Sequence, residues 1–187
     1  MTLPSPYILG PLWGFSELGL SLLKRAKGNA VSKDRASLFV IWAVNLASVG
    51  LGVYLAFHWQ DWASPWLRRL YPVGFGLFVA GLCFRWRCIL YLGRFFTVNV
   101  AIAADHQLIQ TGPYRHVRHP SYTGGLVMLL GYCICVGNLA SLLAIFIPCA
   151  SVILWRIHVE EAALLQAFGE SYRAYMQRTK RLIPWVY

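Results

Sequence analysis

Charge is scarce in this 187-residue sequence: Asp, Glu, Lys and Arg make up 13% of it, and only seven residues are acidic. A soluble domain normally carries about 25% charged residues. The hydrophobic share of 58% and the mean hydropathy of +0.52 point in the same direction. Water is therefore not the main solvent of this chain, and we expect a membrane protein.

Signals for several other classes of protein are missing as well. No Pro-, Ser- or Gly-rich linker, charge block or internal repeat divides the chain, so residues 1–187 are expected to form a single membrane domain. The five cysteines lack paired zinc-type spacing, which predicts buried thiols and no metal site. The N-terminus has no basic region followed by a cleavage site, so the first apolar segment is expected to be retained.

The formal net charge of +10 does not indicate nucleic-acid binding. The seventeen Lys and Arg residues are scattered among apolar runs, and no soluble basic module accompanies them. We therefore expect no nucleic-acid partner, and membrane topology explains the basic residues better.

Five apolar segments approach or reach the roughly 20 residues that a membrane helix needs. They comprise residues 7–23, 38–57, 72–92, 120–136 and 139–155. Gly137 and Asn138 alone separate the last two, which predicts a tight helical hairpin. After Trp155, apolar residues recur at helical spacing among charged ones as far as Tyr172, the pattern of an amphipathic interfacial helix. The expected fold is an all-α integral membrane protein with about five transmembrane helices and a C-terminal amphipathic helix.

The distribution of Lys and Arg predicts the orientation, because short cytoplasmic loops carry an excess of these residues. With the N-terminus outside, five helices place fifteen of the seventeen basic residues on the cytoplasmic side and leave only Arg68 and Arg69 outside. Four helices would mix the two sides. The predicted topology therefore puts the polar segments 105–122 and 156–161 at the cytoplasmic face of the membrane.

These two polar segments flank the predicted hairpin, so they are expected to meet. Ionisable groups at membrane depth are costly unless they are paired or functional. In a purely structural interpretation, Arg118 pairs with Glu160 or Glu161. In the functional interpretation, the same groups form a site. The residues by themselves leave both interpretations open.

Two strings of residues carry a more specific signal. The first is His106-x-Leu108-Ile109-x-x-Gly112-x-Tyr114-x-x-x-Arg118-His119-Pro120-x-Tyr122-x-Gly124, and the second is Arg156-x-x-x-Glu160-Glu161 with the tail Arg181-Leu182-Ile183-Pro184. Their order and spacing resemble those of the isoprenylcysteine carboxyl methyltransferase and phospholipid methyltransferase families. The resemblance makes residues 93–187 the cofactor-binding catalytic half, whereas residues 1–92, with three N-terminal helices, match only in kind.

The resemblance implies an S-adenosylmethionine-dependent methyltransferase whose cofactor site lies at the cytoplasmic membrane face, without a Rossmann fold. The implied cofactor-binding residues are His106, Gln107, Leu108, Gly112, Tyr114, His119, Tyr122, Glu160 and Glu161. A carboxylate there would compensate the cationic sulfonium and amino group of the cofactor. The chain indeed has no G-x-G-x-x-G loop after a strand pattern.

The acceptor implied by the resemblance is a lipophilic, membrane-associated molecule, first of all the carboxylate of a prenylcysteine-like substrate. Arg118, or in second place Arg156, would align that carboxylate through a bidentate guanidinium. The predicted catalytic residues are thus Arg118, Arg156 and Glu161. Membrane lipids and a lipid-modified or lipophilic substrate are the expected partners.

Two alternatives for the function stay open at this point. A phospholipid amine as acceptor would need a base to remove its proton, and Glu161 or His119 could serve. Membrane sterol reductases carry a related C-terminal half with an Arg-His-Pro-type string and use NADPH, although their transmembrane part is much larger.

Overall fold

The computed structural model describes residues 3–23, 35–96 and 107–187. The regular elements in these ranges are helices, apart from two isolated β-bridges. They are α1 (Pro6–Leu23), α2 (Arg35–His58), η1 (Gln60–Trp62), α3 (Pro65–Arg69), α4 (Tyr71–Leu92), η2 (Gly93–Phe95), η3 (Gly112–Arg115), α5 (Pro120–Val136), α6 (Leu139–Phe168) and α7 (Glu170–Arg178). The predicted all-α fold class is confirmed.

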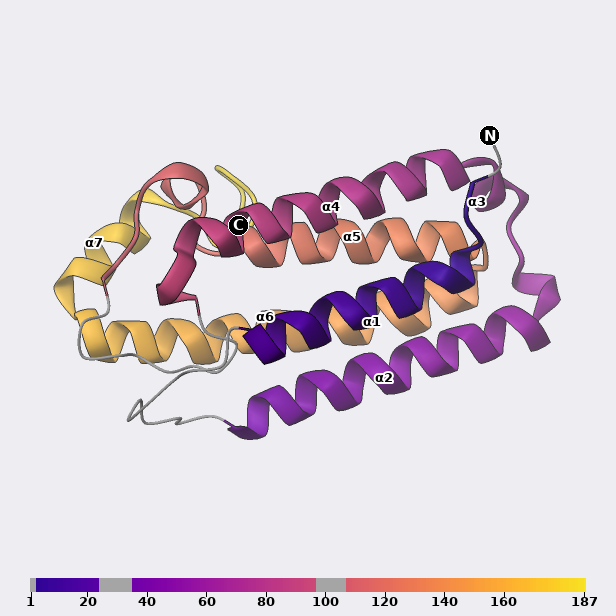
Figure 1. Cartoon of the computed structure of the whole chain (residues 1–187), viewed down its shortest axis with the longest axis horizontal. Helices are drawn as coiled ribbons and strands as arrows, with labels where there is room; N and C mark the ends of the chain where they lie inside the picture. The colour runs from indigo at the N-terminus through magenta and orange to yellow at the C-terminus, as the bar shows by residue number, and fades with distance from the viewer. Residues whose placement is uncertain (1–2, 24–34, 97–106) are drawn as a thin grey trace.

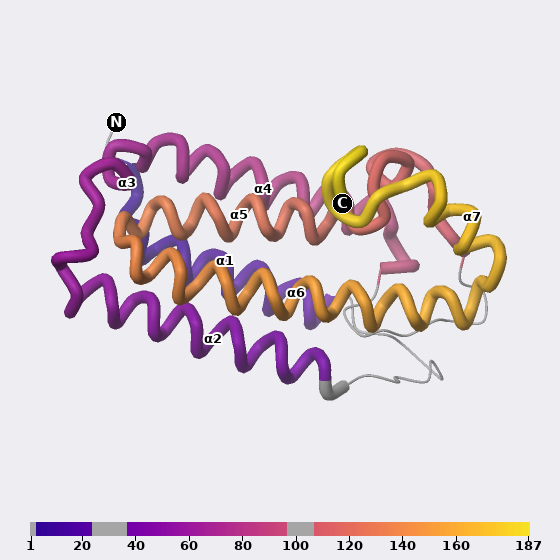
Figure 2. Tube along the Cα trace, turned by 180° about the vertical axis from the view of Figure 1, so that it is seen from behind, coloured from indigo at the N-terminus to yellow at the C-terminus, as the bar shows by residue number. Residues whose placement is uncertain are grey.

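The five long helices α1, α2, α4, α5 and α6 run side by side along the long axis of the molecule (Figures 1 and 2). Short α3 lies at one end of this bundle, and α7 with the C-terminal segment lies at the other. With 30 residues, α6 is the longest helix and continues past its neighbours to the α7 end. The two polar segments of the sequence therefore lie at the same end of the bundle.

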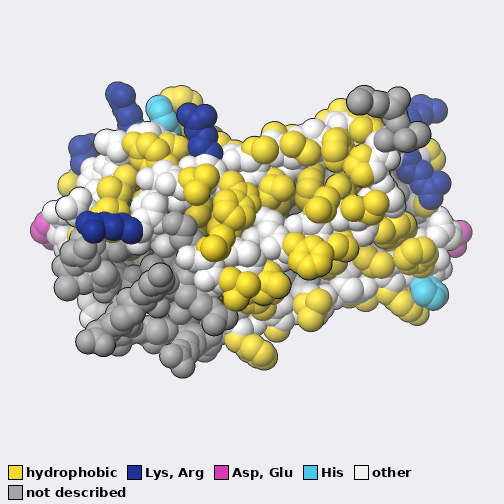
Figure 3. All heavy atoms as spheres, in the orientation of Figure 1, with side chains coloured by type: hydrophobic (Ala, Val, Ile, Leu, Met, Phe, Trp, Pro, Cys, Tyr) yellow, Lys and Arg dark blue, Asp and Glu magenta, His cyan; other side chains and the backbone are white. Residues whose placement is uncertain are grey.

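Three stretches of the described chain are long and apolar enough to cross a membrane: Ser37–His58, Tyr71–Phe95 and Leu139–Phe168. Pro120–Val136 is apolar but shorter, and α1 has 18 residues with Glu17 and Pro11 among them. On the face shown in Figure 3, hydrophobic side chains cover the middle of the molecule, and Lys and Arg gather toward its two ends. The molecule has the surface of an integral membrane protein. Crossing by all five long helices stays a prediction.

Glycines set the distance between α4 and α5, the most closely packed pair of helices. A Cβ added at Gly81 would lie 2.4 Å from the backbone nitrogen of Met128, and one at Gly124 would lie 2.8 Å from that of Arg85. Small residues allow membrane helices to approach in this way, since lipid leaves no hydrophobic drive between them. Gly124, the last residue of the first motif string, therefore has a packing role.

The predicted hairpin between α5 and α6 is confirmed. α5 ends at Val136 and is capped by Gly137, whose φ of +71° favours glycine. Asn138 caps α6 by accepting a hydrogen bond from the Ser141 nitrogen at 3.0 Å. The Ser141 hydroxyl donates to the Gly52 carbonyl of α2 at 2.7 Å. The hairpin turn is thus also fastened to α2.

The predicted end of the last apolar helix at Trp155 is wrong, because α6 continues without a break to Phe168. The sequence changes there from fully apolar to amphipathic, but nothing between these residues interrupts a helix. Gly169, with a φ of +52°, ends α6 and leads into α7. In α7 Tyr172 and Tyr175 are buried, so the amphipathic character predicted for this region is present.

We predict that Gly81→Ala destabilises the folded protein by about 1–3 kcal/mol, since the added methyl group overlaps the α5 backbone. Gly76→Ala, on the same helix, is the matched control, because a Cβ there meets nothing within 4 Å. Thermal unfolding of both variants in one detergent measures the difference. Equal melting temperatures would contradict the close contact between α4 and α5.

Candidate functional site

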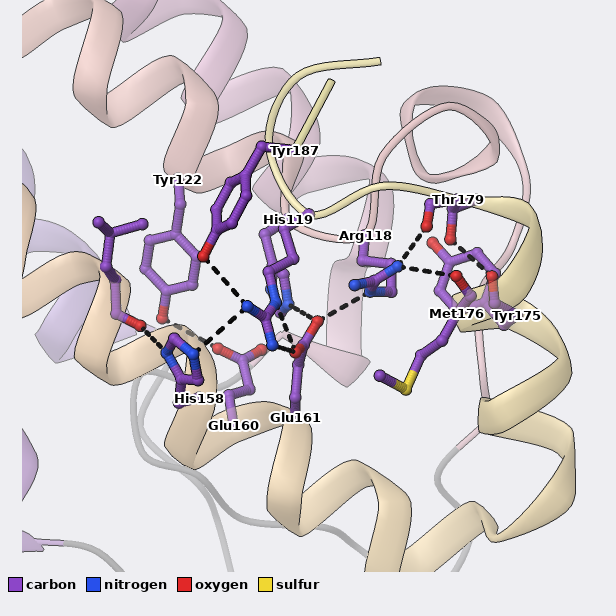
Figure 4. A network of polar contacts seen from close by, with 12 residues as sticks. Arg118, His119, Tyr122, His158, Glu160, Glu161, Tyr175, Met176, Thr179 and Tyr187 are labelled. Carbon is purple, nitrogen blue, oxygen red and sulfur yellow. Dashed lines mark hydrogen bonds and ion pairs between the residues drawn. The ribbon is translucent and has the colours of Figure 1, made fainter. Parts of the chain in front are cut away.

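The carboxylate of Glu161 is the centre of a polar cluster at the α7 end of the bundle (Figure 4). Arg118 donates from Nε to Glu161 Oε1 at 2.8 Å, and Arg181 donates from Nε to Oε2 at 2.8 Å. His119 Nε2 lies 3.3 Å from Oε1. The Glu161 side chain is 4% exposed, so these contacts replace nearly all of its water. Both carboxylate oxygens are therefore engaged.

Burying a carboxylate costs several kcal/mol unless good partners compensate it. Two guanidinium groups do so here, and the hydrogen bond to Glu161 raises the pKa of Arg181 above its ordinary value. Arg118 also donates from Nη1 to the backbone carbonyls of Met176, at 3.2 Å, and Thr179. The cluster thus ties the start of α5, the end of α6 and the end of α7 together.

Backbone pairing brings the C-terminal segment into this cluster. The Arg118 nitrogen donates to the Lys180 carbonyl at 2.8 Å, and the His119 nitrogen donates to the Arg181 carbonyl at 3.0 Å. Pro120 follows at the first turn of α5, where a missing N–H costs nothing. The side chains of Arg118 and Arg181 therefore reach Glu161 from two backbone segments that lie next to each other.

Glu160 differs from its neighbour Glu161 in its surroundings. It is half-buried, and its Oε2 accepts a hydrogen bond from the Tyr122 hydroxyl at 3.0 Å. Arg156 is 2% exposed, donates to the Ser37 hydroxyl of α2 and also interacts with the Tyr122 hydroxyl. One turn of α6 therefore carries a carboxylate saturated by cations and a second carboxylate held by a single tyrosine.

The loop before α5 supplies fewer of the predicted contacts. His106 lies outside the described residues. Gln107 is exposed and Leu108 is half-buried. Gly112 has a φ of +57°, and a Cβ there would lie 2.5 Å from the ring of Tyr91. The conformation and the close ring contact both explain glycine at this position, independently of any cofactor.

Tyr114 is a buried anchor of the same loop. Its hydroxyl donates to the Cys88 carbonyl of α4 at 3.3 Å, and burial raises the pKa of this hydroxyl. Its own carbonyl accepts a hydrogen bond from Tyr175, whose pKa burial raises to about 12. Tyr114 therefore fixes the loop between α4 and α7.

The structure brings five of the predicted site residues into direct contact: Arg118, His119, Tyr122, Glu160 and Glu161. Arg156 adjoins them through Tyr122. Arg181 lies in the tail string, but no role in the site was predicted for it. No signal in the sequence marks the Met176 and Thr179 carbonyls, because every residue has one.

In the part of the chain that the structure describes, no group of three or more His, Cys, Asp or Glu side chains is arranged to hold a metal ion. The five cysteines are free thiols, four of them buried.

The chain is similar in sequence to several known proteins. Residues 74–166 match the model of the isoprenylcysteine carboxyl methyltransferase (ICMT) family. Protein-S-isoprenylcysteine O-methyltransferase B of Arabidopsis thaliana is 31% identical over 191 residues, which cover 97% of this chain and 87% of that protein. Protein-S-isoprenylcysteine O-methyltransferase of Schizosaccharomyces pombe is 35% identical over 118 residues, which cover 59% of this chain and 48% of the relative.

A solved structure shares the fold. It is that of the eukaryotic intramembrane Ras methyltransferase ICMT, with a TM-score of 0.64 and 26% identity over 82% of this chain and 54% of that one. The chain thus spans about half the length of the fission yeast protein and of the solved chain, but most of the Arabidopsis protein.

We predict that Glu161→Gln lowers the free energy of unfolding by about 3–5 kcal/mol, since it leaves two guanidinium groups without their shared counter-charge. Glu160→Gln is the matched control: an amide oxygen still accepts from Tyr122, so the cost should stay below about 1 kcal/mol. Thermal unfolding in detergent compares them. A Glu161→Gln variant as stable as Glu160→Gln would remove Glu161 from the centre of the cluster.

Proposed function

The chain belongs to the isoprenylcysteine carboxyl methyltransferase family, and from this premise we propose that it transfers a methyl group to the carboxylate of a prenylcysteine-like, membrane-associated substrate. The observation that carries the proposal is the meeting of the two motif strings across the α5–α6 hairpin. Arg118 and His119 contact Glu161, and Tyr122 contacts Glu160. The names of the relatives supply the class of reaction.

The methyl donor we propose is S-adenosylmethionine, and the state of Glu160 fits this molecule. Within the described part of the chain, the Glu160 side chain makes one hydrogen bond, from Tyr122. A half-buried carboxylate of this kind can compensate an ammonium or sulfonium group where the dielectric constant is low. Bound S-adenosylmethionine would supply an electrophilic methyl group.

The remaining cofactor contacts are proposed on both sides of Glu160. The loop residues His106, Gln107, Leu108, Gly112 and Tyr114 would line one side, together with Tyr122. His119 contacts Glu161, the neighbour of Glu160 in the chain, and these two residues would support the other cofactor-binding residues. The task of these residues is to bind, to orient and to exclude water, because displacement at a methyl group needs no nucleophilic side chain.

The surroundings of Glu161 favour a carboxylate acceptor over a phospholipid amine. An amine must lose a proton before or during attack. Both Glu161 oxygens already accept hydrogen bonds from guanidinium groups, and His119 is occupied with the same carboxylate. A carboxylate acceptor is ionised at neutral pH and needs no base.

Arg118 and Arg156 are our proposed cations for aligning the acceptor carboxylate. In the described chain, Arg118 uses Nε for Glu161 and Nη1 for two carbonyls, so Nη2 is the atom that would contact the acceptor. A bidentate grip would require Arg118 to release a present partner. Arg156 is more deeply buried and would reach the acceptor from the Tyr122 side.

We further propose that α1, α2, α4, α5 and α6 all cross the membrane, with the N-terminus outside and α7 at the cytoplasmic face. At 1.5 Å per residue, the 30 residues of α6 extend about 45 Å, well beyond a hydrocarbon core of about 30 Å. The last third of α6, which carries Glu160 and Glu161, would then emerge at the interface. A site there would be open to both a soluble cofactor and a lipid-bound acceptor.

The cofactor proposal predicts that detergent-solubilised protein binds S-adenosylmethionine and its demethylated product with micromolar affinity in isothermal titration. NADPH should not bind. Glu160→Ala should weaken binding by about tenfold or more, as loss of a charge-assisted contact does, without changing the melting temperature greatly. Binding of NADPH in place of the methyl donor would instead support a reductase of the sterol type.

The acceptor proposal predicts methylation of a prenylcysteine analogue with a free carboxylate, but not of its carboxamide or of an aminophospholipid. Arg118→Lys keeps the charge yet loses the guanidinium geometry, so turnover should fall by about 10–100-fold while cofactor affinity changes little. Arg178→Lys, at an exposed position of α7, is the control. Normal methylation by the Arg118 variant would refute its assigned role.

A further inference from the structure

A second ion pair, partly buried, joins two helices of the bundle close to the polar site. Arg85 of α4 donates from Nε to Glu17 Oε1 at 2.8 Å and from Nη2 to Glu17 Oε2 at 2.9 Å. The two side chains are only 13% and 24% exposed. The bidentate geometry explains how α1 can carry a carboxylate within an otherwise apolar helix, and it fastens α1 to α4.

The third nitrogen of the same guanidinium contacts the start of α5. Arg85 Nη1 donates to the Ser121 carbonyl at 3.2 Å. Gly124 and Gly125 leave the room for this contact: a Cβ at Gly124 would lie 2.8 Å from the Arg85 backbone nitrogen, and one at Gly125 would lie 3.5 Å from Nη1. The guanidinium therefore lies directly against the first turns of α5.

Electrostatics make this contact dependent on Glu17. The N-terminus of a helix carries a partial positive charge, so a guanidinium beside it is unfavourable unless an anion compensates it. Glu17 supplies that anion from α1. The ion pair with Glu17 therefore allows Arg85 to donate a hydrogen bond to the carbonyl of Ser121 in the first turn of α5.

We infer that Arg85 is a positioning residue for the site, which fixes the first turn of α5 through the Ser121 carbonyl and so holds His119 and Tyr122 against the two carboxylates of α6. Glu17 is its counter-charge. For catalysis this inference rests on the proposed function, whereas its structural part does not. If Arg85 served only to join α1 to α4, the ion pair with Glu17 would suffice, and the hydrogen bond to the Ser121 carbonyl would not be needed.

A charge swap separates the two roles. The double variant Glu17→Arg/Arg85→Glu can re-form the ion pair, but a glutamate at position 85 cannot donate to the Ser121 carbonyl. We expect Arg85→Gln to lower both the melting temperature and the rate of methyl transfer. The swap should restore the melting temperature, yet leave turnover at least about tenfold below wild type, the loss typical of a misplaced catalytic group.

Amide hydrogen exchange of residues 119–125 gives a readout that does not depend on activity. These amides should exchange faster than in the wild type in both Arg85→Gln and the swapped variant. If wild-type protein methylates nothing, the proposed function fails, and the exchange rates still test the positioning role. Recovery of both turnover and protection in the swapped variant would overturn the inference and leave a tether only.

Arg85→Lys provides the test if the swapped variant does not fold. A single ammonium group can keep the pair with Glu17 but cannot also serve the Ser121 carbonyl in the same geometry. Its melting temperature should stay near the wild-type value while turnover falls and residues 119–125 exchange faster. Wild-type turnover and protection in this variant would again overturn the inference.

Discussion

The compensation of one buried carboxylate, Glu161, is the constraint on which the polar end of this protein depends. Its two guanidinium partners, Arg118 and Arg181, both come from outside α6. Their approach requires the C-terminal segment to lie against the residues before α5. The contacts that satisfy Glu161 are thereby the same contacts that assemble α5, α6, α7 and the tail into one site.

The membrane imposes the complementary constraint on the rest of the bundle. Between lipid-facing helices, close packing and satisfied polar groups replace the hydrophobic drive. Gly81 and Gly124 allow the close packing of α4 against α5. The ion pair of Glu17 with Arg85 satisfies the polar groups between α1 and α4. Through Arg85, this ion pair also contacts the start of α5, next to the residues for which chemistry is proposed.

Much of this architecture was predictable from the sequence, because apolar runs and short turns follow local rules. The Gly137–Asn138 turn predicted a hairpin, and the hairpin in turn predicted that Arg118 would meet Glu160 or Glu161. In the structure Arg118 contacts Glu161. The continuation of α6 past Trp155 was missed, because a change from apolar to amphipathic sequence does not itself end a helix.

Long-range partners were the other part that the sequence could not supply. The pairing of Glu17 with Arg85 joins residues 68 positions apart, and nothing in the local sequence of either identifies the other. Arg181 stood in a recognised string, but its proximity to Glu161 depends on the backbone pairing of the tail. Carbonyl acceptors such as Met176 carry no sequence signal at all.

The position of Arg181 in the chain has a consequence for biosynthesis. The ribosome releases the N-terminal end of a chain first, so α1 to α6 emerge before the segment that pairs with Arg118 and His119. Arg181 therefore reaches Glu161 only after the chain that forms α1 to α7 has left the ribosome. The contact of Arg181 with Glu161 is accordingly the last of the Glu161 contacts that the emerging chain can make.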